Sequence, residues 1–293
     1  MTQKKITIFL NKFLIFLLGE RITYRLGRSI YMHSRGDIPN DIAYNGEKLV
    51  QYSVIKEIAN NSDFSCFNIF DVGANVGDWT NLFLSQLKEV SFDGNIDIFV
   101  FEPVPSTIAT LRQNLPHNSH FIHIQEVALS SSPGKSDIYV SGKNLGINSL
   151  HQDDSNIQKE VIQISLDSVF NFCLSRKINH IHLLKSDTEG HDMEVIRGAI
   201  PLLSEGRISI LQFEYNHRWI FSHNFLRDVF LLVEGMPYKV AKLQEHCLLI
   251  FKNWNPELDR FFEGNYALIH DDALGWFPTK YADFDCSNSL RIT

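Results

Sequence analysis

Residues 67–80 read FNIFDVGANVGDWT, and this stretch decides the fold. An apolar run precedes Asp71, which is typical of a buried strand. Gly73 and Gly77 then enclose a short turn, and from Trp79 onward apolar residues recur at helical spacing. Because glycine has no side chain and tolerates positive φ, a ligand can approach the backbone of such a turn closely. The stretch therefore predicts a strand, a ligand-binding turn and a helix.

Two kinds of nucleotide-like ligand compete for this turn. A dinucleotide site requires G-x-G-x-x-G, but the second and third glycine positions hold Asn75 and Asp78. Asp78 would place a negative charge near a pyrophosphate, which disfavours NAD. The pattern instead resembles the first motif of class I S-adenosylmethionine (SAM) methyltransferases. SAM carries an ammonium and a sulfonium but no phosphate, so a nearby acid is favourable. A plain strand–helix turn with a structural Asp71 remains an alternative.

Whole-chain composition excludes several classes of protein. The 293 residues are 44% hydrophobic and 12% aromatic, enough for a packed core. The formal net charge of −7 disfavours electrostatic affinity of the protein as a whole for nucleic acid or anionic lipid, and leaves room for a local basic patch. Four cysteines are scattered without a C-x-x-C pair, which favours reduced thiols and a cytoplasmic protein. The length allows one large α/β domain with additions, or two small domains.

The first 44 residues form a basic, helical, amphipathic segment. Ile6 to Leu18 is strongly apolar, but thirteen residues are too few to span a bilayer. Glu20 and Arg21 follow where a signal peptide would carry small residues at its cleavage site. We expect one helix, from about residue 6 to 32, packed on the catalytic domain. The alternative is peripheral contact with a membrane surface, as basic amphipathic helices make.

Strand and helix patterns alternate between residues 45 and 251. They predict a Rossmann-like α/β domain with a mostly parallel, seven-stranded sheet and helices on both faces. Residues 238–243 and 247–251 form the antiparallel hairpin expected at its end. Residues 252–293 are interpreted as a C-terminal extension packed on the core. The sequence leaves the oligomeric state open.

A second acid, Glu102, ends the second predicted strand, 31 residues after Asp71. Ligands of open parallel sheets bind outside the carboxyl ends of the strands, and a carboxylate there can accept hydrogen bonds from both ribose hydroxyls. Residues 126–128 follow the third strand and would lie beside the adenine ring. The predicted cofactor-binding residues are Asp71, Gly73, Asn75, Gly77, Glu102, Glu126, Val127 and Ala128.

Five motifs together resemble the FkbM-type methyltransferases. They are DVGANVG at 71–77, EP at 102–103, ALS at 128–130, SLD at 165–167 and LKSDTEG at 184–190. Ser186 departs from the aliphatic residue more usual at its position. The resemblance implies a Rossmann-like SAM-dependent fold and methyl transfer to a hydroxyl oxygen of a sugar, a glycan or a natural product. It does not fix the acceptor. The alternatives are an NAD-dependent oxidoreductase or epimerase, and a non-catalytic SAM-binding module.

Charged residues cluster after the fourth strand of the predicted core. Removal of a hydroxyl proton needs a base, and His191 or Asp187 is predicted to supply it, with Lys185 beside them. Asp187, Glu189 and Glu214 could instead hold Mg²⁺, or the charges could form a structural network at a helix N-terminus. Aromatic and polar residues that end the fifth strand are predicted to bind the acceptor: Tyr215, Asn216, His217 and Trp219.

Overall fold

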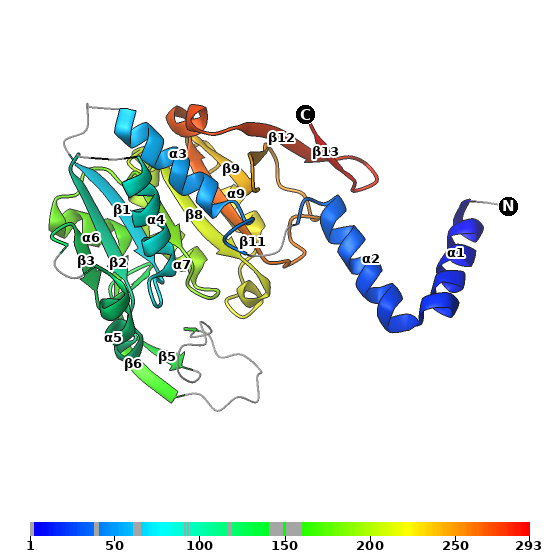
Figure 1. Ribbon diagram of the computed structural model, residues 1–293, viewed down its shortest axis with the longest axis horizontal. Coiled ribbons are helices and arrows are strands. Elements are labelled where there is room, and N and C mark those ends of the chain that lie inside the picture. Colours follow the sequence, from blue (N-terminus) through cyan, green and yellow to red (C-terminus); the bar gives the residue numbers. More distant parts are fainter. Residues whose placement is uncertain are drawn as a thin grey trace.

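A large twisted sheet forms the centre of the molecule (Figure 1). The computed structural model describes residues 3–37, 41–60, 66–90, 92, 94–116, 119–140, 149–150 and 160–293. Within them the sheet has ten strands, in the order β13-β12-β10-β9-β11-β8-β7-β1-β2-β3. Their bounds are β1 Phe67–Val72, β2 Ile96–Phe101, β3 Ile122–Gln125, β7 Leu183–Ser186, β8 Ile210–Tyr215, β9 Tyr238–Leu243, β10 Leu248–Phe251, β11 Gly264–His270, β12 Thr279–Phe284 and β13 Leu290–Ile292.

A second, three-stranded sheet of order β4-β6-β5 lies beside the first. Its strands are β4 Ala128–Ser130, β5 Gly134–Val140 and β6 Glu160–Ser168. The helices are α1 Gln3–Leu18, α2 Glu20–Ser34, α3 Glu47–Asn60, α4 Asp78–Glu89, α5 Pro105–Asn114, α6 Val169–Arg176, α7 Asp192–Gly198, α8 Ile200–Ser204 and α9 Leu226–Leu232, with 3₁₀ turns η1 His217–Ile220 and η2 Asp271–Trp276.

Five neighbouring strands of the large sheet run in the same direction. β3, β2, β1, β7 and β8 run parallel, so their carboxyl ends meet at one edge. β11 lies antiparallel between β8 and β9, and β9 pairs antiparallel with β10. The hairpin predicted from residues 238–251 is therefore present, and the prediction of a Rossmann-like, mostly parallel α/β sheet is confirmed.

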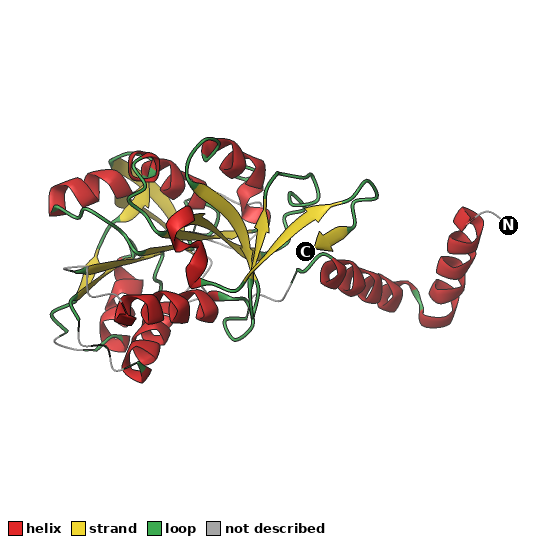
Figure 2. Cartoon of the chain, turned by 90° about the horizontal axis from the view of Figure 1, so that it is seen from above, coloured by secondary structure: helices red, strands yellow, loops and turns green. Residues whose placement is uncertain are grey.

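Helices cover both faces of the sheet, as predicted (Figure 2). Alternating residues of β1 show why: Phe67 and Ile69 join the core cluster that contains α3 and α4, whereas Phe70 and Val72 join the cluster that contains α6 to α9. Successive side chains of a strand point to opposite faces, so a strand covered on both sides is apolar almost throughout.

The C-terminal residues differ from the prediction. Residues 252–293 were expected to pack outside a seven-stranded sheet, but β11 inserts into its middle and β12 and β13 extend its edge. Tyr266 and Leu268 of β11 pack in one core cluster, Ala267 and Ile269 in the other. A boundary at residue 251 would remove a central strand, since β9 reaches β8 only through β11.

The N-terminal segment also differs. It forms two helices, bent at Gly19 with φ +79°, and they extend away from the sheet (Figure 1). No side chain of α2 is buried, and those described in α1 are exposed except for half-buried Leu18. The expectation of a single helix packed on the catalytic domain is therefore wrong. Within the described residues, no helix has the length and apolar content needed to cross a membrane.

Candidate active site

A cavity opens at the carboxyl ends of β1, β2 and β7, where the parallel strands place their loops. The small sheet closes one side through Ile138 of β5 and residues of β4. Of the predicted cofactor residues, five line this cavity: Gly73, Asn75, Glu102, Val127 and Ala128. The other lining residues are Val72, Phe101, Pro103, Leu129, Ile138, Leu150, Asp187, Thr188, Glu189 and His191.

Both glycines of the β1–α4 turn have left-handed backbone. Gly73 has φ +76°, and a Cβ placed there would lie 2.0 Å from the carbonyl oxygen of Asp187. Gly73 thus lets the loop after β1 touch the loop after β7. Gly77 has φ +94°, and its Cβ would lie 2.8 Å from Leu111 of α5, so its smallness serves helix packing rather than the cavity. Close backbone approach is the use of glycine that the motif predicts.

Glu102 lies in the cavity wall with most of its surface buried. One carboxylate oxygen accepts the Asn75 backbone N–H at 3.1 Å, and the other accepts the Val104 N–H at 2.9 Å. Burial raises the pKa of Glu102 to about 7, although these two hydrogen bonds act to lower it. Asn75 has φ +49°, the left-handed region that Asn tolerates better than most residues, and this conformation aims its N–H at Glu102.

Asp71 does not line the cavity, which differs from its predicted role as a cofactor ligand. Its carboxylate is fully buried, accepts the Thr80 hydroxyl at 2.5 Å and lies 3.3 Å from Lys185 Nζ. Lys185 is itself buried. Burial acts to lower its pKa, but the charges of Asp71, Asp187 and Glu47 outweigh that effect and the pKa is raised. The acid of the first motif therefore holds a buried cation between β1 and β7.

Glu126 is the other predicted cofactor residue that lies elsewhere. It is exposed and pairs with Arg112 of α5 at 2.6 Å, whereas its neighbours Val127 and Ala128 line the cavity. The chain turns between β3 and β4 here, so adjacent side chains point to different sides. Of the three residues predicted to lie beside adenine, the apolar Val127 and Ala128 line the cavity and the polar Glu126 does not.

The loop between β7 and α7 brings two of the predicted catalytic residues, Asp187 and His191, and the predicted metal ligand Glu189 to the cavity, whereas the third predicted catalytic residue, Lys185, is buried and does not line it. Asp187, Glu189 and His191 all line it, and His191 occupies the N-cap position of α7. The His191 ring nitrogen Nε2 lies 3.0 Å from Ser130 Oγ of β4. Glu189 and Gly190 both have positive φ, which turns the loop sharply between strand and helix.

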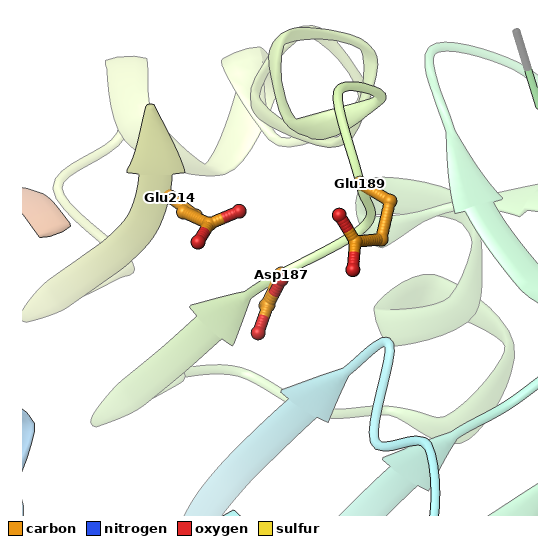
Figure 3. A group of neighbouring side chains, drawn as sticks. All are labelled: Asp187, Glu189 and Glu214. Atoms are coloured by element: carbon orange, nitrogen blue, oxygen red, sulfur yellow. The ribbon is translucent and has the colours of Figure 1, made fainter. Parts of the chain in front are cut away.

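Three acids lie close together (Figure 3): Asp187 and Glu189 in the loop after β7, which line the cavity, and Glu214 of β8, which does not. Asp187, Glu189 and Glu214 each offer a carboxylate oxygen, and these oxygens lie within 4.8 Å of one another. Two of them already have cationic partners: Lys185 lies 3.5 Å from Asp187, and Arg218 pairs with Glu189. Burial and the negative charges of Asp187, Asp192 and Glu263 raise the pKa of Glu214 well above its usual value.

Two of the predicted acceptor residues are core residues instead. Tyr215 and Trp219 are fully buried in the cluster under α9, where the Tyr215 hydroxyl donates to Asp259 at 2.7 Å and Trp219 Nε1 donates to the Glu214 carbonyl at 3.0 Å. Asn216 is buried and donates to the Glu214 carboxylate at 2.6 Å. His217 is exposed. The aromatic rings lie inward because Leu211, Phe213 and Tyr215 share one face of β8, and that face is covered.

Sequence reasoning missed Arg218, Ile138 and Leu150. Arg218 stands within the polar stretch after β8 and could have been noticed as a cation facing the acids of the β7 loop. Ile138 lies in β5 and Leu150 between β5 and β6, and apolar residues in that region carry no motif.

Comparison with known proteins places these residues in context. A family model described as "Methyltransferase FkbM domain" matches residues 71–240, more than half of the chain. Methyltransferase 1 of Beauveria bassiana is 29% identical over 154 residues, covering 44% of this chain and 57% of that protein. The hexuronic acid methyltransferase AglP of Haloferax volcanii is 26% identical over 144 residues, covering 49% of this chain and 54% of that protein. The chain thus matches little more than half the length of either relative.

Among solved structures, Aeropyrum pernix fibrillarin with natively bound SAM is similar with a TM-score of 0.36 and 12% identity. The similarity covers 76% of this chain and 75% of that chain.

Proposed function

This chain belongs to the FkbM methyltransferase family, and on that premise we propose that it transfers the methyl group of SAM to a hydroxyl oxygen of a sugar-containing acceptor. One observation carries the proposal. The cavity at the ends of β1, β2 and β7 is lined by the glycine turn after β1 and by the buried Glu102 after β2. These are the positions at which a Rossmann-like sheet binds the ribose of a nucleoside ligand.

Glu102 suits the ribose of SAM. Each of its carboxylate oxygens accepts one backbone N–H and keeps a lone pair free, so the group can accept two further hydrogen bonds from vicinal hydroxyls. Val127, Ala128 and Leu129 offer an apolar wall for the adenine ring. The carboxylates of Asp187 and Glu189, which line the cavity, favour a cationic ligand and repel a pyrophosphate. This electrostatic character supports SAM over NAD.

SAM supplies an activated methyl group when bound, so the protein must position the acceptor and remove its proton. His191 and Asp187 both reach the cavity and remain our proposed bases. Lys185 does not suit that role, because its raised pKa keeps it protonated. We assign Lys185 a positioning role, in which it neutralises Asp71 and lies 3.5 Å from Asp187.

The base assignment is tested by His191→Gln and Asp187→Asn, singly and together. We expect the double variant to lose at least 100-fold in kcat, the scale at which a positioned base contributes, and to lose far less in SAM affinity, where only the attraction of the Asp187 charge is removed. Full turnover by the double variant would exclude both residues.

Mg²⁺ at Asp187, Glu189 and Glu214 is a further part of the proposal. Three carboxylate oxygens within 4.8 Å suit a hard cation that prefers oxygen ligands. A cation would also offset the negative charge that raises the pKa of Glu214. Titration with MgCl₂ in buffers of different ionisation heat should then show proton release, because the metal requires ionised Glu214. Glu214→Gln should abolish that release, and the absence of any Mg²⁺ heat in the wild-type protein would refute the metal.

The proposal of a sugar acceptor is supported by the name of one relative. AglP is named for methylation of hexuronic acid, and it supports a sugar hydroxyl as the acceptor. Calorimetric titration with SAM and with NAD should give binding of SAM alone. Methyl transfer from labelled SAM into a panel of uronic-acid glycans and hydroxylated natural products should then identify the acceptor. NAD binding would support an oxidoreductase, and SAM binding without transfer to any acceptor would favour a non-catalytic module.

A further inference from the structure

Helices α1 and α2 form an arm that the rest of the molecule leaves uncovered (Figures 1 and 2). The large apolar side chains of α1 stand in water, with Phe16 at 87% exposure and Phe9 at 64%. They occur on all sides of the helix, since Phe9, Leu10 and Ile8 lie about 100° apart and all three are exposed. A helix that is apolar all round is normally buried, so something outside this chain covers it.

The charge of the arm contrasts with that of the remaining chain. Residues 1–34 hold six Lys or Arg and one acid, Glu20, whereas residues 35–293 hold 21 Lys or Arg and 33 Asp or Glu. Arg21, Arg25 and Arg28 follow i, i+4, i+7 spacing and share one face of α2. The apolar Ile22, Leu26 and Ile30 flank that stripe and are exposed. Cations and apolar side chains therefore run together along the whole arm.

The base of the arm is fixed to the body by buried polar contacts. Arg35 donates to Glu257 Oε2 at 2.5 Å and to Asp37 at 2.8 Å, and Asp37 also pairs with Lys242. Tyr31 donates to Glu257 at 2.7 Å. Arg35, Asp37 and Glu257 are all buried. The arm thus projects in a direction set by β9 and the segment before β11.

We propose that this arm docks the protein on a membrane surface that contains anionic lipid. Apolar side chains on every side of α1 can be covered by the interfacial region of a bilayer, whereas a flat protein face would cover one side. The cations spread along both helices then lie at the level of the headgroups. The acidic body is repelled by the same surface, so the arm alone makes contact. This inference does not depend on the methyltransferase proposal.

Flotation of the full chain with vesicles tests the docking. We expect binding to phosphatidylcholine vesicles that contain about 30 mol % phosphatidylglycerol, at least tenfold weaker binding to phosphatidylcholine alone, and weakening between about 0.1 M and about 0.5 M NaCl. Arg21→Gln with Arg25→Gln should weaken binding about thirtyfold, since each basic residue near the surface strengthens binding about fivefold. Phe9→Ser with Phe16→Ser should weaken it at least tenfold.

A matched control removes two exposed lysines of the body, Lys135→Gln with Lys280→Gln, and should bind as the wild type does. All three variants should keep the wild-type thermal midpoint, since none of the changed side chains is buried. Equal binding to neutral and anionic vesicles, or unchanged binding of the arginine variant, would overturn the proposal. So would an arm-dependent dimer in light scattering without vesicle binding, because a second copy would then cover the arm.

Discussion

Replacing Lys185 by Met probes the buried ion pair that supports the site. The Lys185 ammonium lies 3.3 Å from Asp71 and 3.5 Å from Asp187, and its side chain is 5% exposed against 0% for Asp71. Methionine keeps an unbranched chain of similar length but removes the charge. Asp71 is then left as a buried carboxylate whose remaining polar partner is the Thr80 hydroxyl. Removal of one partner of a buried pair costs about 3–5 kcal/mol.

The double variant, in which Asp71→Asn accompanies Lys185→Met, tests whether the loss of stability comes from the unpaired charge of Asp71. The introduced asparagine is neutral and can still accept the Thr80 hydroxyl, so no uncompensated charge remains. We expect the double variant to recover at least about 1.5 kcal/mol relative to Lys185→Met alone, a coupling typical of residues in direct contact. Asp71→Asn alone should cost less than Lys185→Met, because Asp187 and Glu47 still stabilise the ammonium.

Urea unfolding followed by circular dichroism measures these free energies, and Lys185→Met should also lower the thermal midpoint by roughly 10 °C. The exposed pair of Lys239 with Asp271, 2.9 Å apart, is the matched control, and Lys239→Met should cost under about 1 kcal/mol. A cost of Lys185→Met no larger than that of the control, or a loss in the double variant equal to the sum of both single losses, would refute this prediction, because the buried ion pair would then not stabilise the fold.

Three further predictions concern the cavity and the core. Burial raises the pKa of Glu102 to about 7 in the folded protein, so folding favours its protonated form. The free energy of unfolding should therefore be highest below about pH 4.5, and this stabilisation is lost as the pH rises through 7. SAM binding requires ionised Glu102, so SAM affinity should weaken by up to roughly tenfold per pH unit below pH 7. Calorimetric SAM affinities that do not change with pH in the wild type, or that do change in Glu102→Gln, would contradict this. Gly73→Ala should destabilise by more than about 2 kcal/mol in urea, from left-handed strain and contact with the β7 loop, whereas Gly134→Ala, with open space around it, should be nearly neutral. Trp219→Ala should cost about 3–5 kcal/mol without raising the KM for acceptor beyond the effect of exposed His217→Ala; a selective rise in that KM would restore Trp219 to the acceptor site.

The part of the site that the sequence predicts well depends on local pattern and parallel register. β1 pairs with β2 and β7 so that Val72 stands opposite Phe101 and Ser186. Residues that directly follow these strands must therefore meet, which is why Gly73, Glu102 and Asp187 can be assigned to one cavity from the sequence. To make this assignment, it is enough to know where each strand ends and in which direction it runs.

The errors arise where the direction of a side chain depends on a distant partner. Asp71 turns inward because Lys185, far away in the sequence, supplies a buried cation, and the motif itself does not reveal that contact. Tyr215 was assigned to the acceptor although alternation from Leu211 and Phe213 already indicates the covered face. The place of β11 could not be read locally, because an antiparallel strand from the tail enters the sheet only through its pairing with β8 and β9.

The charges around β7 differ between the strands and the loop that lines the cavity. Lys185 of β7 pairs with Asp71 of β1, and neither side chain lines the cavity. In the loop after β7, Glu189 pairs with Arg218, while Glu214 of β8 faces the charges of Asp187 and two further acids. The raised pKa of Glu214 is the consequence of burial together with this excess negative charge. A cation close to these acids, whether the sulfonium of SAM or a metal ion, would therefore gain electrostatic stabilisation that a phosphate would lose, and we expect the loop that carries the proposed base also to favour a cationic ligand.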